Sequence, residues 1–136
     1  MKFIRYWLPV FFWMAVIFVF STKESVQISE QTLVNFLFFK TLHIIEYAVL
    51  FTFFVRALRN SSAKIRNVFL LAFIFTFWYA VTDEIHQMFV PTRQGQPRDV
   101  IIDALGAMLA WYFLKQLLPK APKKLQLWVK NWQITS

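Results

Sequence analysis

The sequence predicts an all-α integral membrane protein, an antiparallel bundle of four transmembrane helices with an amphipathic helix at the membrane surface after them. Its 136 residues are 58% hydrophobic and 20% aromatic, with a mean hydropathy of +0.48, outside the usual range of soluble domains. The apolar residues gather in four blocks of a length suited to crossing a bilayer. Two glycines in the whole chain argue against a β-rich or loop-rich architecture.

The net charge of +8 does not indicate a nucleic-acid-binding protein. The Lys and Arg residues lie between and after the apolar blocks, without a soluble basic domain or a platform on which bases could stack. Basic flanks of membrane helices explain this placement better, and membrane lipids are therefore the expected partners. The chain has no Cys, so neither a disulfide framework nor thiolate chemistry is expected.

The first membrane helix is expected over residues 6–20, after Lys2 and Arg5. This start resembles that of a signal peptide, but the apolar run ends in bulky residues without a cleavage pattern, so we expect a retained helix. Pro9 falls near its first turn, where the missing N–H group is tolerated.

The second apolar segment, residues 32–58, carries polar residues inside otherwise apolar sequence. Lys40, His43, Glu46 and Tyr47 follow helical spacing and form one stripe, which is typical of a bundle helix whose stripe faces protein. Lys40 is expected to snorkel outward. His43 and Glu46 could also form a plain structural pair, and the sequence leaves this alternative open.

The third and fourth segments are expected over residues 68–90 and 99–118, joined by a loop rich in Pro and Gly. Asp99 is well placed to cap the fourth helix, although a role in a site is an equal alternative. Residues 1–122 would then form one four-helix transmembrane domain.

Residues 123–136 are expected to form a basic, amphipathic, cytoplasmic tail. Its apolar residues recur at positions i, i+3, i+4 and i+7, with lysines alongside, which is typical of a helix lying on an anionic membrane surface. The residues in this pattern are Leu125, Trp128, Val129 and Trp132, with Lys124 and Lys130.

The distribution of Lys and Arg predicts the orientation. The N-terminus, the second connection and the C-terminal tail are basic, whereas the first and third connections also hold acidic residues or lie beside them. The positive-inside rule therefore places both termini in the cytoplasm and these two connections outside. Almost all ionisable groups within the apolar segments then fall in the outer half of the bundle.

Such groups are costly in hydrocarbon, about 2.5–3.5 kcal/mol each near the bilayer centre, so their clustering indicates a functional site. Three helical faces carry them: His43 and Glu46, then Asp83, His86 and Gln87, then Asp99 and Asp103. We expect these faces to converge on one cavity open to the outside. Glu84 points away from the face of Asp83 and His86, and a solvated position at the membrane interface is expected for it.

Candidate roles follow from side-chain chemistry. The candidates for catalysis, as acid, base or metal ligand, are Glu46, Asp83, His86, His43 and Asp103. The candidates for substrate binding are Arg93, Arg98, Tyr47, Gln87, Asp99 and Glu84. The spacings His43-x-x-Glu46 and Asp83-x-x-His86 would let each helix offer two ligands to a shared divalent metal ion, the one cofactor that the pattern suggests. Arg93 and Arg98 could instead be interfacial anchors or neutralise neighbouring acids.

At these residues the sequence resembles the VanZ-like family of small bacterial membrane proteins, named for a teicoplanin-resistance determinant. Matching motifs span most of residues 10–110, with Thr at position 92 and Gln at position 96 as departures. The motifs are Phe12-Trp-Met-Ala-Val-Ile-Phe18, His43-x-x-Glu46-Tyr47, Thr82-Asp-Glu-Ile-His-Gln87, Phe89-Val-Pro91-x-Arg93-x-Gly95 and Arg98-Asp99-Val100 through Asp103 and Gly106. The resemblance implies a protein of the bacterial inner membrane linked to the cell envelope and to glycopeptide resistance, without an assigned reaction.

Three functions fit these features. One is an enzyme at the outer leaflet, on a lipid-linked or phosphate-bearing envelope substrate whose anionic group Arg93 and Arg98 would clamp. Another is a non-enzymatic binding or accessory protein for an envelope precursor or antibiotic. Ion-coupled transport ranks last, because the inner half offers no matching polar path. The oligomeric state does not follow from the sequence.

Overall fold

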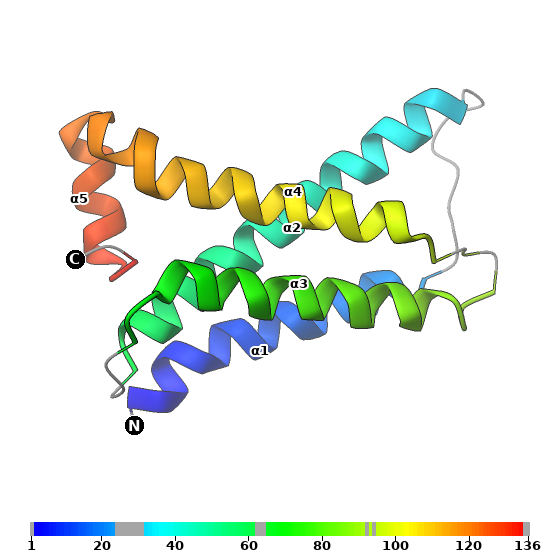
Figure 1. Cartoon of the computed structure of the whole chain (residues 1–136), viewed down its shortest axis with the longest axis horizontal. Coiled ribbons are helices and arrows are strands. Elements are labelled where there is room, and N and C mark those ends of the chain that lie inside the picture. The colour runs from blue at the N-terminus through cyan, green and yellow to red at the C-terminus, as the bar shows by residue number, and fades with distance from the viewer. Residues whose placement is uncertain (1, 24–31, 62–64, 92, 94, 135–136) are drawn as a thin grey trace.

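The computed structural model describes residues 2–23, 32–61, 65–91, 93 and 95–134 (Figure 1). This part of the chain is helical and contains no β-strand. In chain order the elements are α1 (Lys2–Ser21), α2 (Thr32–Arg59), α3 (Val68–Gln87), α4 (Pro97–Tyr112), a π-helical turn η1 (Phe113–Leu117), a 3-10 turn η2 (Leu118–Lys120) and α5 (Lys123–Asn131).

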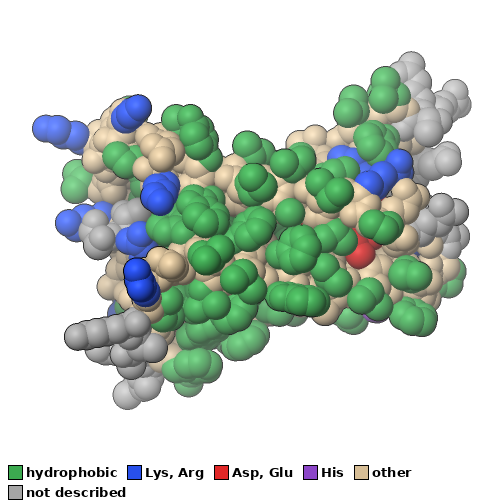
Figure 2. Space-filling view, in the orientation of Figure 1, with side chains coloured by type: hydrophobic (Ala, Val, Ile, Leu, Met, Phe, Trp, Pro, Cys, Tyr) green, Lys and Arg blue, Asp and Glu red, His purple; other side chains and the backbone are tan. Residues whose placement is uncertain are grey.

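Within the described residues, four helical segments are long and apolar enough to cross a membrane: Phe3–Ser21, Leu33–Arg59, Val68–Gln87 and Pro97–Lys120. Successive segments alternate in direction, and hydrophobic side chains cover the middle of the molecule (Figures 1 and 2). Because large apolar side chains exposed in such numbers are unfavourable in water, this surface suits contact with lipid. The predicted helical membrane bundle is confirmed.

Helix α2 lies at the centre of the bundle and packs against α1, α3 and α4. Its inward face is fully buried at Tyr47, Leu50, Phe51 and Val55. These residues continue the stripe of Lys40 and His43, so the stripe is polar toward the start of α2 and apolar toward its end. One helical face therefore supplies both the core and the polar end of the bundle.

Helices α2 and α4 cross closely because Gly106 lies at their contact. A Cβ atom at this position would overlap the backbone carbonyl oxygen of Ile44. The neighbours Ala104 and Ala107 are also small and buried. Small residues let helix backbones approach in a membrane protein, and this approach brings the polar start of α4 against α2.

Three helix boundaries differ from the prediction. Helix α1 begins at Lys2, so Pro9 lies about two turns inside the helix and not near its first turn. Helix α3 ends at Gln87, about a turn early. Helix α4 begins at Pro97, whose fixed φ suits the first helical position, so the predicted capping role of Asp99 is wrong.

The C-terminal amphipathic helix is present as α5, but the chain after it folds back onto the bundle. The backbone oxygens of Trp132 and Gln133 accept hydrogen bonds from Arg56 Nε at 2.7 Å and Asn60 Nδ2 at 2.9 Å, respectively. Tyr6 Oη donates to Gln133 Oε1 at 2.8 Å. The tail is thus docked on the start of α1 and the end of α2, which the sequence did not indicate. Its contact with a lipid surface stays a prediction.

Candidate functional site

Buried polar side chains gather at one end of the bundle, where α1 and α3 end and α2 and α4 begin (Figure 1). Among the described residues, Thr76 is the one buried polar side chain outside this group. The group consists of Ser21, Asp83, Glu84, Gln87, Asp99 and Asp103. The three polar faces therefore meet at this end.

Asp83 joins three helices through one carboxylate oxygen. Its Oδ2 accepts hydrogen bonds from Ser21 Oγ at 2.9 Å, Gln87 Nε2 at 3.1 Å and Tyr47 Oη at 3.3 Å. Hydrogen bonds to an ionised group are stronger than neutral ones, and this oxygen is fully engaged. In this structure Asp83 of α3 therefore holds the three helices together through Ser21 of α1 and Tyr47 of α2.

One ion pair and one contact between an imidazole and a carboxylate join α2 to α4 in the described part of the chain. Lys40 Nζ lies 2.6 Å from Asp99 Oδ2, and His43 Nδ1 lies 3.2 Å from Asp103 Oδ1. The side chain of Lys40 is only 19% exposed, so the prediction that it snorkels outward is wrong. The close crossing at Gly106 places a carboxylate within its reach, and an ion pair inside the protein replaces contact with the interface.

The contact between His43 and Asp103 orients an imidazole. Asp103 is completely buried, and neither of its oxygens accepts another hydrogen bond within the described part of the chain. With Nδ1 of His43 directed at this carboxylate, its Nε2 is left for a second partner. The arrangement suits proton transfer at Nε2.

Glu84 supports the loop between α3 and α4. Its Oε2 accepts the backbone N–H of Gln96 at 2.9 Å, and a Cβ atom at Gly95 would overlap the backbone oxygen of Glu84. Because the loop folds over the end of α3, Glu84 is buried, and the predicted solvated position is wrong.

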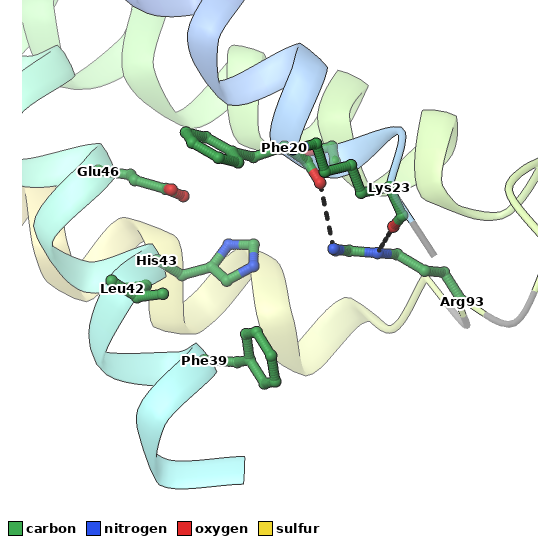
Figure 3. A pocket seen from close by; sticks show the side chains of 8 residues that line it. Phe20, Lys23, Phe39, Leu42, His43, Glu46 and Arg93 are labelled. Carbon is green, nitrogen blue, oxygen red and sulfur yellow. Dashed lines mark hydrogen bonds between the residues drawn. The ribbon is translucent and has the colours of Figure 1, made fainter. Parts of the chain in front are cut away.

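A cavity of about 230 Å³ lies between the end of α1, the first half of α2 and the loop before α4 (Figure 3). His43 and Glu46 project from α2 toward it, and Arg93 lies across from them. The Glu46 carboxylate has no hydrogen bond or ion pair within the described chain, unlike that of Asp83. The other lining residues are Phe20, Ser21, Lys23, Phe39 and Leu42.

Arg93 closes one side of the cavity and is held there by three hydrogen bonds. It donates from Nε to the Lys23 carbonyl at 2.8 Å, from Nη2 to the Phe20 carbonyl at 3.2 Å and from Nη1 to Gln87 Oε1 at 3.2 Å. The Phe20 carbonyl lies in the last turn of α1 and the Lys23 carbonyl lies two residues after the helix, so both anchor the guanidinium at this end of α1. A guanidinium carries five N–H donors, so two of those of Arg93 have no partner within the described part of the chain and could bind an anion.

The other predicted site residues lie outside the cavity. The ring of His86 lies against that of Phe18 of α1, with centroids 4.3 Å apart and a tilt of 30° between the ring planes. The guanidinium of Arg98 lies over the ring of Phe36, and its Nε is 3.6 Å from Asp99 Oδ1. Of the three predicted polar faces, only that of α2 lines the cavity. The polar faces of α3 and α4 instead form the helix–helix contacts behind the cavity.

The sequence did not identify Lys23 or the apolar lining residues Phe20, Phe39 and Leu42 as part of the site. A signal existed for Phe39 and Leu42, because both share a helical face with His43 and Glu46 at spacings of three and four residues. Nothing in the sequence linked that face to Phe20 and Lys23.

The candidate metal ligands were His43, Glu46, Asp83 and His86. Among the described residues no three His, Asp or Glu side chains are arranged to hold a metal ion. Asp83 Oδ2 faces hydrogen-bond donors, and His86 is turned toward α1. A divalent ion stays a prediction from spacing alone, and the chemistry proposed below uses none.

The chain was compared with protein families, curated proteins and solved structures. A family model described as VanZ/LLP1 matches residues 6–118, which include the greater part of each of the four membrane segments and every residue of the cavity. No curated protein and no solved structure matches the chain.

Proposed function

Because the chain belongs to the VanZ/LLP1 family, we propose that this multi-pass membrane protein acts on a lipid-linked, phosphate-bearing envelope substrate at the outer leaflet of the bacterial inner membrane. The observation that carries the proposal is the composition of the cavity. It combines apolar walls, two cations, an oriented imidazole and a carboxylate without a partner in the described chain.

The lining suits an amphiphile with an anionic head. Phe20, Phe39 and Leu42 offer apolar contact to a hydrocarbon chain. Arg93 and Lys23 offer positive charge, and a guanidinium matches the geometry of phosphate oxygens. A lipid phosphate satisfies both halves of this lining, whereas an apolar lipid would leave the cations without a partner.

His43 and Glu46 supply the groups for acid–base chemistry at the bound phosphate. His43, oriented by Asp103, accepts a proton from an attacking water molecule as the water oxygen bonds to phosphorus. Glu46 in its protonated form donates a proton to the lipid oxygen as the bond between that oxygen and phosphorus breaks, which releases inorganic phosphate and the lipid alcohol. Arg93 stabilises the negative charge of the transferring group. Asp83 acts in this scheme by holding the helices in place.

A binding protein without turnover is the second candidate. The observation in its favour is that Arg93 and His43 are already held in position, and a preorganised site binds with a smaller ordering cost. Such a protein would hold an envelope precursor or an antibiotic at the outer surface. The family resemblance adds a link to teicoplanin resistance to either form of the proposal.

Ion-coupled transport fits less well. Beyond Thr76, the buried residues in the other half of the described bundle are apolar, so they offer no polar path across the membrane.

The test uses the full chain in lipid nanodiscs with farnesyl monophosphate as the probe and farnesol as the uncharged control. We expect binding of the phosphate and not of the alcohol, measured by calorimetry, and release of inorganic phosphate if the protein is an enzyme. Glu46→Gln should keep binding and lose release. Equal binding of farnesol and its phosphate, or none of either, would remove this substrate class.

The resistance link has its own readout. Cells that express the wild type should tolerate more teicoplanin than cells that express Glu46→Gln at equal membrane levels, if turnover confers resistance. Equal tolerance with retained binding would favour the binding protein, and no tolerance from either chain would separate this protein from glycopeptide resistance.

A further inference from the structure

The end of the molecule opposite the cavity is strongly basic. Within the described part of the chain, residues 2–8, 56–61, 65–66 and 115–130 contain ten of the fifteen Lys and Arg residues and none of the seven Asp and Glu residues. Figure 2 shows Lys and Arg side chains gathered at this end, around α5 and the end of α4. These stretches therefore give this end of the protein an excess of positive charge.

A groove of about 550 Å³ lies between α3 and α4 near this basic end. This volume is within the roughly 300–1,000 Å³ of small-molecule sites in proteins. Leu70 and Phe73 of α3 face Met108, Trp111 and Tyr112 of α4 across it. In the view of Figure 1, α3 and α4 lie farther apart toward the basic end than toward the other end. Its walls suit a hydrocarbon chain.

One end of the groove is polar. Lys115 and Gln116 belong to the π-helical turn η1, and both are exposed and line the groove. No carboxylate lies within ion-pair distance of Lys115 in the described part of the chain. Single π-helical turns inside α-helices occur often at functional sites. Here the turn places an ammonium and an amide beside an apolar groove, a pair of groups suited to a phosphate diester.

We propose that this groove binds one acyl chain of an anionic glycerophospholipid, whose phosphate contacts Lys115 and Gln116. A zwitterionic lipid has no net negative charge, because its headgroup carries a cation beside the phosphate, so its attraction to Lys115 should be weaker. The attraction of one lysine for an anionic lipid should make that lipid bind about five times more tightly than a zwitterionic lipid with the same acyl chains. The site is separate from the cavity and stands whether or not the proposed function is correct.

Native mass spectrometry of the full, delipidated chain in detergent tests this site. The protein is titrated with phosphatidylglycerol or with phosphatidylcholine of identical acyl chains. The wild type should bind one phosphatidylglycerol about five times more tightly than one phosphatidylcholine. Lys115→Gln should abolish the preference, whereas the matched control Lys124→Gln, which removes an equal charge from α5 outside the groove, should keep it.

A second variant tests the apolar part. Met108→Trp fills the groove from an exposed position and should weaken the first binding event for both lipids. The proposal is overturned if Lys115→Gln and Lys124→Gln lower the preference equally, since the basic surface would then act as a whole. It is also overturned if Met108→Trp leaves lipid binding unchanged, or if the groove proves to be a contact between two copies, seen as a dimer that excludes lipid and is lost in Met108→Trp.

Discussion

Nδ1 of His43 lies 3.2 Å from Oδ1 of Asp103, and this pair places a fully buried carboxylate behind an imidazole in the cavity wall. The imidazole also stacks nearly parallel to the ring of Tyr47, with centroids 6.5 Å apart, and Tyr47 donates to Asp83. A continuous line of contacts thus runs from α4 through α2 to α3. Substitutions of the buried residues in this line should therefore alter the position of His43 in the cavity wall.

The pair of His43 and Asp103 should behave as one unit in stability measurements. For His43→Gln, Asp103→Asn and the double variant, we expect a coupling of about 0.5–3 kcal/mol in the free energy of unfolding, because each single change already breaks the contact. Unfolding by SDS titration in mixed micelles measures it. Asp103→Asn combined with the distant Tyr6→Phe is the control and should be additive. Additive costs for His43 and Asp103 would contradict the contact.

Asp83→Ala should be among the most destabilising single changes at this end. It removes the acceptor of three hydrogen bonds, and loss of bonds to a charged group costs on the order of 3 kcal/mol. Ser21→Ala removes one of these donors and should cost about 1 kcal/mol. Thermal unfolding of both variants in the same detergent compares them. A cost for Asp83→Ala no larger than that for Ser21→Ala would show that the carboxylate does not hold the helices together.

Glu46→Gln should leave stability unchanged and alter function. Its carboxylate has no partner in the described chain, so the free energy of unfolding should move by less than about 0.5 kcal/mol. Phosphate release from farnesyl monophosphate, if present in the wild type, should fall to background. The same preparation supplies both measurements. A stability loss above that range would instead assign Glu46 a structural role.

Gly106→Ala should separate α2 from α4. The added Cβ would overlap the backbone oxygen of Ile44, and overpacking of this kind costs about 1–3 kcal/mol. Leu109→Ala, on the exposed side of the same helix, is the control and should be nearly neutral. SDS titration measures both. Equal, small effects would mean that the two backbones do not approach as closely as described.

The docked tail should open more often in Tyr6→Phe. This change removes the hydrogen bond to Gln133, worth about 1 kcal/mol, which corresponds to roughly fivefold faster amide exchange in the tail if the exchange proceeds by local opening. The amides of Trp132, Gln133 and Ile134 are the reporters, since each donates to a carbonyl of α5. Tyr112→Phe on the exposed face of α4 is the control. Unchanged exchange would show that the tail is held without this bond.

The helices and the uneven placement of charge were predictable because both are local properties. A run of apolar residues becomes a membrane helix almost wherever its neighbours lie, since every backbone group must be satisfied within it. Spacing also placed Lys40, His43 and Tyr47 on one stripe of α2, which the structure bears out. The start of α4 was missed by two residues because Pro97 suits the first helical position better than a cap at Asp99.

The division of roles among the polar residues came only from the tertiary structure. Asp83 and Glu46 are both acids within apolar segments, yet one is enclosed by three donors and the other faces the cavity without a partner in the described chain. Which of these environments a side chain meets depends on the rotation of its helix and on the crossing at Gly106. The sequence by itself determined that α-helices would cross a membrane and gather acids, His and Arg at one end. The packing of those helices decided the rest, because contact between residues far apart in the chain is not a local property.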